Sequence, residues 1–279
     1  MSLPRATTKG VPPALADRLL QRLGLAPSLE PSVASLAEIY RAWCRAIPFD
    51  NVLRRVQLAE GNAGPLPGLR PGSFIQDYLD HGTGGPCAPA GGALEAMLRR
   101  FGFKTRMLLA ALGTERGLRP DHATVLVQLG DEKFLLDTVI LCERPIPLPP
   151  EGGFREPDPL HPVVVEREEA GWRVEYASAM TRSSAGCTVL DRELNRREQA
   201  LLYRSTQESE TFRRFNSALY VRRNEPDGVS IVYGGWHVVV RRNEERLERQ
   251  IETDERARLL IGSFGLSPGI VSRLPEDEL

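Results

Sequence analysis

Lysine is almost missing from this chain of 279 residues, since three of its 36 basic residues are lysines and the other 33 are arginines. The 37 acidic residues bring the formal net charge to −1. So small a net charge attracts neither nucleic acid nor an anionic membrane surface. No run of about 20 apolar residues, the length that crosses a bilayer, is present. The first residues (M-S-L-P) lack a basic and then apolar signal. We therefore expect a cytoplasmic protein, and the arginine, alanine, glycine and proline bias indicates a GC-rich bacterial genome.

Cysteine is also scarce, and no two cysteines form a C-x-x-C pair. The four are Cys44, Cys87, Cys142 and Cys187. This spacing argues against a zinc knuckle or a thioredoxin-type motif, and thiols in the cytoplasm stay reduced. The histidines outside residue 122 lack partners at metal-ligand spacing, so we expect no metal site. A composition of 41% apolar and 26% charged residues is that of an ordinary globular protein.

The first hundred residues carry mainly helical patterns. Apolar side chains recur at helical spacing over residues 12–23, 32–44 and 88–101. Between them, residues 61–72 hold four glycines and three prolines, which predicts a loop.

After Gly102 the pattern changes to short segments rich in Val, Leu, Phe and Thr, which predict strands. The expected strands are 105–112, 122–129, 133–141, 163–166, 172–176, 217–223, 230–233 and 237–241, with Gly234-Gly235 as a turn. Two further helices are expected at 190–203 and at 253–264, the latter capped by Thr253. Helices followed by strands predict an α+β protein. The paired arginines at 196–197, 213–214, 222–223 and 241–242 sit among acids and are expected on a solvated surface.

A glycine-rich turn places Cys87 at the start of the third predicted helix. Two glycines precede it in the segment 84–89 (G-G-P-C-A-P) and allow a sharp turn. The partial positive charge of a helix N-terminus favours the thiolate, which is the nucleophilic form of cysteine. A buried structural cysteine at a tight turn is an equally good interpretation of this segment alone.

A predicted hairpin brings His122 and Asp137 to the same face. Gly130-Asp131 forms a suitable two-residue turn, so Leu129 pairs with Glu132 and the register follows along both strands. His122 and Asp137 are then diagonal neighbours, with Cα atoms roughly 7–8 Å apart. A carboxylate there can hold one imidazole nitrogen and leave the other for a thiol. A satisfied core pair, with no chemistry, is the alternative.

The order Cys87, His122, Asp137 resembles the papain-like triad of the arylamine N-acetyltransferases. Other segments are similar to that family's motifs too. Residues 22–25 (R-L-G-L) resemble its R-I-G-Y/L, 47–51 (I-P-F-D-N) its I-P-F-E-N, 84–87 (G-G-P-C) the end of R-G-G-x-C, 136–137 (L-D) the start of D-V-G-F-G, and 264–266 (F-G-L) a C-terminal segment.

The resemblance implies a fold, a site and a reaction. The expected fold has a helical lobe (1–100) that carries Cys87, a β-barrel lobe (101–200) that carries His122 and Asp137, and an α/β lid (201–279). The expected enzyme moves an acetyl or other acyl group from CoA to an aromatic or related amine, in a ping-pong mechanism through acyl-Cys87. Acetyl-CoA is the expected donor and a small-molecule amine the expected acceptor.

Several positions depart from the family's motifs. Thr83 replaces the arginine expected to pair with the acid of I-P-F-E-N, so Asp50 needs another partner. Val139 and Leu141 replace two glycines after the aspartate. We expect both side chains, together with Phe49, to line the substrate pocket and to restrict simple arylamines.

Three other functions stay open at this point. The chain could be an amide synthase of the same fold that takes its acyl group from a carrier-protein thioester in natural-product biosynthesis. It could be a non-catalytic relative that only binds a ligand or partner. A cysteine hydrolase is the weakest, because the triad by itself does not choose between water and amine.

Overall fold

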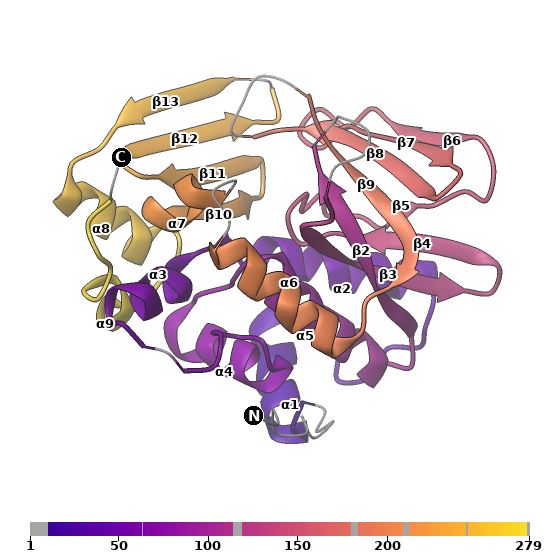
Figure 1. The fold of residues 1–279 in the computed structure, drawn as a ribbon, viewed down its shortest axis with the longest axis horizontal. Coiled ribbons are helices and arrows are strands. Elements are labelled where there is room, and N and C mark those ends of the chain that lie inside the picture. Colours follow the sequence, from indigo (N-terminus) through magenta and orange to yellow (C-terminus); the bar gives the residue numbers. More distant parts are fainter. Residues whose placement is uncertain are drawn as a thin grey trace.

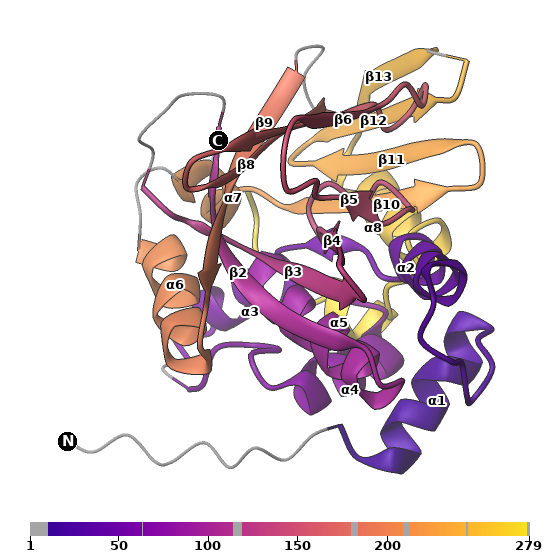
Figure 2. The same ribbon diagram turned by 90° about the vertical axis from the view of Figure 1, so that its right-hand side faces the viewer.

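The N-terminal part of the molecule is helical, as expected. A computed structural model describes residues 11–62, 64–113, 119–179, 184–208, 212–243 and 245–277. Its first helices are α1 (Pro13–Leu23), α2 (Val33–Ala46), α3 (Val52–Ala59), α4 (Pro71–His81) and α5 (Cys87–Arg100). Figure 2 shows α1, α4 and α5 gathered on one side of the molecule, below the strands.

Three of these helices confirm the sequence patterns. α1 ends at Gly24, which has a φ of 70°. α2 begins after Ser32, whose side chain accepts a hydrogen bond from the Ser35 N–H, while the Ser35 side chain accepts one from the Ser32 N–H. The patterns missed α3 and α4. The predicted loop at 61–72 ends at Pro71, where α4 begins and soon buries Phe74.

The middle of the chain forms an eight-stranded antiparallel sheet that curls into a barrel-like shape (Figure 1). Its order is β5-β4-β3-β2-β9-β8-β7-β6. The strands are β2 (Lys104–Leu112), β3 (His122–Leu129), β4 (Glu132–Leu136), β5 (Ile146–Pro147), β6 (Gly153–Glu156), β7 (Val163–Glu168), β8 (Gly171–Ala177) and β9 (Ser184–Glu193). The main hydrophobic core lies between this sheet and the helices, with α5 packed against β2 and β3.

The predicted hairpin register is confirmed by β3 and β4. Leu129 pairs with Glu132 and Leu126 with Leu135, and Gly130 takes the left-handed conformation that the turn needs, with a φ of 58°. The residues of β3 and β4 that share one face of the hairpin are therefore those that the turn predicted.

The second strand of this hairpin is shorter than predicted, because β4 ends at Leu136 instead of continuing to Leu141. Asp137 Oδ1 accepts hydrogen bonds from the N–H groups of Val139 (2.8 Å) and Ile140 (3.0 Å). These bonds turn the backbone out of the sheet. The apolar residues that follow resemble a strand in sequence, but they form a buried turn.

The helix predicted over 190–203 was also placed too early. Residues 190–193 are the last four of β9, and the helix α6 (Arg196–Glu208) begins after them. The predicted cap of the last long helix was wrong as well. In α8 (Thr253–Gly262) the N-cap is Glu252, and its side chain makes no capping hydrogen bond.

A five-stranded antiparallel sheet completes the fold in the order β1-β10-β11-β12-β13. Its strands are β1 (Phe49–Asp50), β10 (Tyr220–Glu225), β11 (Gly228–Tyr233), β12 (Trp236–Arg241) and β13 (Arg246–Gln250), and the remaining helices are α7 (Arg213–Ser217) and α9 (Pro268–Val271). The turn at Gly234-Gly235 is confirmed. β1 comes from the helical part of the chain, pairs with β10 and also bridges to Gly85.

These elements confirm the predicted α+β class. The three-part division at residues 100 and 200 stays a prediction. None of the helices in the described ranges is long and apolar enough to cross a membrane.

Candidate active site

Cys87 is the first residue of α5, as the sequence predicted. Pro86 is the N-cap residue, and Cys87 is half-buried. The preceding loop presses closely against the chain around β1. A Cβ atom on Gly84 would lie 1.7 Å from the Pro48 carbonyl oxygen, so only glycine fits there. This close contact fixes where α5 begins and therefore where the thiol lies.

His122 and Asp137 form a fully buried pair. His122 is the first residue of β3, Asp137 directly follows β4, and His122 Nε2 lies 2.6 Å from Asp137 Oδ2. Both side chains have no exposed surface. Tyr40, in α2, adds a support that sequence reasoning missed. Its hydroxyl accepts from the Asp137 N–H (3.1 Å) and donates to the Asp137 carbonyl (2.7 Å).

The electrostatics of this pair favour a charged imidazolium. Burial alone lowers the pKa of His122, but the charges of Asp137 and Cys87 outweigh it and hold that pKa well above its usual value. Burial raises the pKa of Asp137, but the His122 charge and hydrogen bonds from His122, Ile140 and Val139 hold it below its usual range. His122 Nδ1 is buried and has no hydrogen-bond partner among the described residues. This nitrogen is therefore available to a group at Cys87.

The other three cysteines differ from Cys87 because they are buried. Burial raises the pKa of the Cys44 and Cys187 thiols well above the usual value, and raises that of Cys142 to about 11. Buried, protonated thiols are poor nucleophiles.

The predicted pocket residues lie in different environments. Phe49 is half-buried and stacks on Phe215, with ring centroids 5.7 Å apart, and it forms a T-shaped pair with Tyr220. Val139 is half-buried and lies two residues after Asp137. Leu141 is 1% exposed and belongs to the main core, and its φ of 51° is unusual for a residue with a side chain. Leu141 therefore belongs to the hydrophobic core, and its role in the substrate pocket stays a prediction.

The five-stranded sheet holds the turn after Asp137 by hydrogen bonds to its carbonyl groups. Arg222 Nη1 and Nη2 donate to the carbonyl oxygens of Val139 and Ile140, both at 2.8 Å, and Asn224 donates to that of Leu141 at 2.7 Å. The sequence predicted a solvated arginine at 222, but Arg222 is 6% exposed. That prediction was wrong because a pattern of charged residues in the sequence does not show that carbonyl groups of a distant segment will accept hydrogen bonds from one of them.

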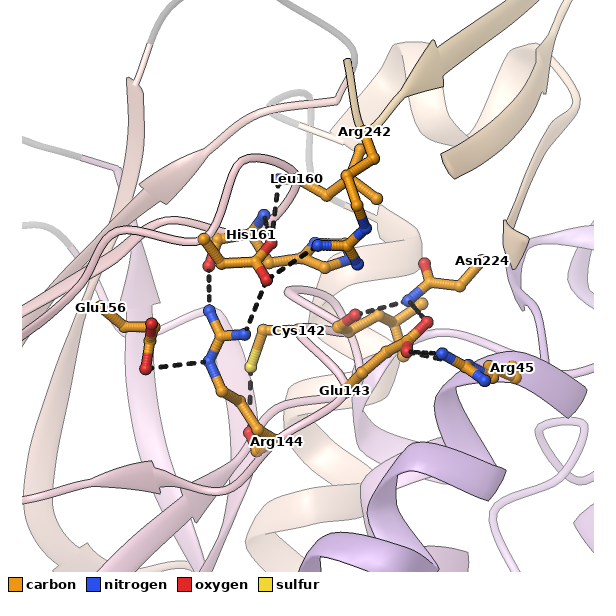
Figure 3. Close-up of polar contacts among 11 residues, drawn as sticks. Arg45, Cys142, Glu143, Arg144, Glu156, Leu160, His161, Asn224 and Arg242 are labelled. Carbon is orange, nitrogen blue, oxygen red and sulfur yellow. Dashed lines mark hydrogen bonds and ion pairs between the residues drawn. The ribbon is translucent and has the colours of Figure 1, made fainter. Parts of the chain in front are cut away.

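Ion pairs fasten the next part of the same segment, as Figure 3 shows. Arg45 of α2 pairs with Glu143 at 2.8 Å, and Arg144 pairs with Asp158 at 3.1 Å. Arg242, at the end of β12, also reaches Asp158 at 3.2 Å. The segment from Asp137 onward is thus tied to helices and to both sheets.

Asp50 finds backbone partners in place of the missing arginine. Its Oδ2 accepts from the Gly84 N–H (2.6 Å) and its Oδ1 from the Val52 N–H (3.0 Å). Burial raises the pKa of Asp50 to about 7, although these two N–H groups oppose the shift. The carboxyl therefore holds the loop before Cys87 through hydrogen bonds to the backbone.

A small cavity lies against this same loop. Residues on its wall include Asp50, Arg54, Gly84, Pro86 and Tyr203. Sequence reasoning missed Arg54 and Tyr203. In the sequence, Arg54 stands out only as a charged residue between the apolar residues Val52 and Val56. No group of three or more His, Cys, Asp or Glu side chains able to hold a metal was found in the described ranges.

Comparison with known proteins identifies the family. A family model described as N-acetyltransferase matches residues 32–269, which is most of the chain. A search of curated proteins found no match.

Solved structures of arylamine N-acetyltransferases share the fold at low sequence identity. The Salmonella typhimurium enzyme is 19% identical with a TM-score of 0.78, over 94% of this chain and 97% of that one. A Mycobacterium smegmatis enzyme is 18% identical with a TM-score of 0.78, over 93% and 97%. A Bacillus cereus enzyme, described as having a unique Cys-His-Glu catalytic triad, is 14% identical with a TM-score of 0.73, over 91% and 98%. The chain is therefore a divergent member of the N-acetyltransferase family, an acyltransferase with the fold of the arylamine N-acetyltransferases.

Proposed function

We propose that this protein transfers an acyl group, with acetyl as the first choice, from CoA to an aromatic or related amine through an acyl-Cys87 intermediate. The observation that carries the proposal is the buried His122–Asp137 pair. Its His122 Nδ1 is free of partners among the described residues, and the charge of Cys87 helps to raise the pKa of His122. Cys87, His122 and Asp137 are the proposed catalytic residues. Asp137 holds His122 by Nε2, which leaves Nδ1 to exchange a proton with the reacting groups.

In the first half-reaction the Cys87 thiolate attacks the carbonyl carbon of the acyl-CoA thioester. A carbon–sulfur bond to Cys87 forms, the bond to CoA breaks, and CoA sulfur leaves with the proton from His122. The first backbone N–H groups of α5 have no partner within the helix and are suited to stabilise the developing oxyanion.

In the second half-reaction the amine nitrogen attacks the acyl-cysteine. His122, now neutral, takes a proton from that nitrogen as the new carbon–nitrogen bond forms and the Cys87 sulfur leaves as thiolate. The thiolate–imidazolium pair is restored, so atoms and charges balance over the cycle. Phe49 and Val139 are the proposed contacts for the acceptor. Both are half-buried, Phe49 bridges to Gly85 in the loop before Cys87, and Val139 lies two residues after Asp137.

Intact-mass spectrometry tests this proposal directly. Mixing the protein with acetyl-CoA should add one acetyl group, peptide mapping should place it on Cys87, and a Cys87→Ser variant should carry no thioester. Adding an arylamine or hydrazine should then remove the acetyl group and produce the amide. Loss of the acetyl group to water at the same rate with and without amine would indicate a hydrolase. No acylation by any thioester would contradict the proposal.

A further inference from the structure

Arg54 carries a positive charge that no described carboxylate balances at close range. It is the third residue of α3, and its side chain is 1% exposed. Nη1 makes one long hydrogen bond of 3.4 Å to the Thr206 hydroxyl, whereas Nε and Nη2 are buried and have no partner among the described residues. Burial lowers the pKa of Arg54 to about 10, so the group stays charged at neutral pH. A buried charge with two unused N–H donors is costly unless something binds it.

The unused donors form the part of a guanidinium that recognises carboxylates. Nε–H and the N–H of Nη2 point in parallel from one edge of the plane, which is the edge where a guanidinium receives carboxylate oxygens. The Arg54 guanidinium also lies over two aromatic rings, with Cζ 5.8 Å from the Tyr203 ring centroid and 5.9 Å from that of Phe215. Aromatic faces stabilise a cation but accept nothing from the donors in its plane.

A further unused donor, from a different residue, lies on the wall of the same cavity. The Tyr203 hydroxyl is buried and has no hydrogen-bond partner in the described part of the chain. The cavity holds about 10 Å³, which is roughly the space that one water molecule needs. It therefore suits a single oxygen of a small planar anion and is too small for a phosphate group.

Asp50 lies on the same cavity wall but does not neutralise Arg54. Its two oxygens accept hydrogen bonds from Val52 and Gly84, and among the described residues no ion pair joins it to Arg54. The groups whose ionised forms favour a charged Arg54 are Tyr203 and then Cys87, and the proposed function makes Cys87 a thiolate in the resting protein. Acylation turns that thiolate into a neutral thioester, so the positive charge of Arg54 then loses this partner.

We infer that Arg54, with the Tyr203 hydroxyl, binds a carboxylate of the substrate beside Cys87. This inference rests on the proposed function. The carboxylate belongs either to the acyl group, as in a dicarboxylic acid monothioester, or to the amine acceptor, as in an aminobenzoate. In both cases it replaces the charge that Cys87 loses on acylation.

Two pairs of substrates that differ in charge test the inference and identify the source of the carboxylate. Succinyl-CoA is compared with butyryl-CoA as donor, and 4-aminobenzoate with its methyl ester as acceptor. The readout is the ratio of kcat/KM for the anionic member to that for the neutral member. In the wild type at least one ratio should favour the anion, and that pair identifies whether donor or acceptor carries it.

Arg54→Met keeps much of the side-chain volume and removes the charge. We expect it to reduce the favoured ratio about 10- to 100-fold, as the loss of a charged hydrogen bond does. Arg54→Lys should retain part of the preference and Tyr203→Phe should reduce it less. Arg197→Met, which replaces an exposed arginine of α6, should leave the ratio unchanged. Equal losses for both members of each pair, or a wild type without any preference for the anion, would overturn the inference.

A binding measurement separates this inference from the proposed function. Calorimetry with benzoate and with benzamide needs no turnover, so it is informative even if Cys87 is never acylated. Benzoate should bind the wild type more tightly than benzamide, and the difference should disappear in Arg54→Met and shrink in Tyr203→Phe. If Arg54→Met does not fold, the Tyr203→Phe and Arg54→Lys results decide. Equal binding of benzoate and benzamide to the wild type would contradict an acceptor carboxylate at Arg54. The comparison of succinyl-CoA with butyryl-CoA then decides whether Arg54 binds a carboxylate of the donor.

Discussion

Arg222 of β10 donates a 2.8 Å hydrogen bond to the carbonyl oxygen of Val139, two residues beyond Asp137. The same guanidinium holds the next carbonyl group, that of Ile140. The C-terminal sheet therefore holds the carbonyl groups of this turn, while the N–H groups of the same turn donate hydrogen bonds to the Asp137 carboxylate. This arrangement makes Arg222 a positioning residue for the proposed triad.

Arg222→Met should slow acylation of Cys87 because the turn after Asp137 loses two charged hydrogen bonds. We expect kcat to fall about 10-fold or more, since each such bond contributes about 1.5–3 kcal/mol. Arg223→Met is the control, because Arg223 donates to the Ser263 carbonyl and not to this turn. Equal rates for the two variants, measured by single-turnover mass spectrometry, would remove the positioning role.

Cys87 should react with iodoacetamide before the other thiols at pH 6. Burial raises the pKa of Cys44, Cys142 and Cys187, whereas His122 stays charged and supports a thiolate at Cys87. Peptide mapping after limited labelling identifies the modified residue. In His122→Ala the labelling of Cys87 at pH 6 should become slow, because the positive charge of His122 is lost. Equal labelling of all four cysteines in the wild type would favour a non-catalytic protein.

Asp137→Asn should slow acyl transfer by about 10³- to 10⁴-fold, as the loss of the triad carboxylate does elsewhere. An amide can still accept hydrogen bonds from Val139 and Ile140 but no longer stabilises a charged His122. The fold should survive, which circular dichroism checks. His122→Ala should slow transfer at least as much, and combining the two changes should add little. Near-native turnover in a folded Asp137→Asn would show that the pair is structural.

Leu141→Gly should be more stable than Leu141→Ala by about 1 kcal/mol, although glycine is the smaller residue. Both changes remove the same buried leucine, which costs about 2–5 kcal/mol. At a φ of 51° alanine keeps the backbone strain that glycine relieves. Chemical denaturation of the two variants gives the comparison. An alanine variant more stable than the glycine variant would mean that Leu141 is not strained.

Asp50 should make the protein less stable as the pH rises from about 4 to 7. Its pKa is raised to about 7 in the fold, so over this range the folded protein binds more protons at this site than the unfolded chain. The free energy of unfolding should therefore fall by up to about 1.4 kcal/mol per pH unit and level off above pH 7. Denaturation of wild type and Asp50→Asn across this range isolates the effect, because other groups cancel in the difference. A difference that does not change with pH would contradict a raised pKa.

The sequence predicted the His122–Asp137 contact and the start of a helix at Cys87 because both depended on local information. A two-residue turn at Gly130 sets the register of β3 and β4, and a glycine pair followed by a helix pattern places Cys87. The chain after Asp137 was misjudged because an apolar run has the same appearance in a strand and in a buried turn. What distinguished them was the Asp137 side chain, which accepts from two N–H groups further on.

Arg54 and Arg222 could not be assigned from sequence for a different reason. Their surroundings are supplied by residues far along the chain: Tyr203 and Phe215 for Arg54, and the carbonyl groups beyond Asp137 for Arg222. A charged residue in a single sequence is expected to be solvated. Only the tertiary structure shows that these two are enclosed.

The two-residue strand β1 has a consequence for dividing the molecule. Phe49 pairs with Arg222 on one side and bridges to Gly85 on the other, so the loop before Cys87 depends on a strand from the C-terminal sheet. A fragment that ends before β10 would leave main-chain groups of β1 without their partners. Exposed strand edges of this kind recruit a strand from another molecule. Such a fragment should therefore aggregate or swap when alone, and regain an ordered Cys87 loop when the missing piece is supplied in trans.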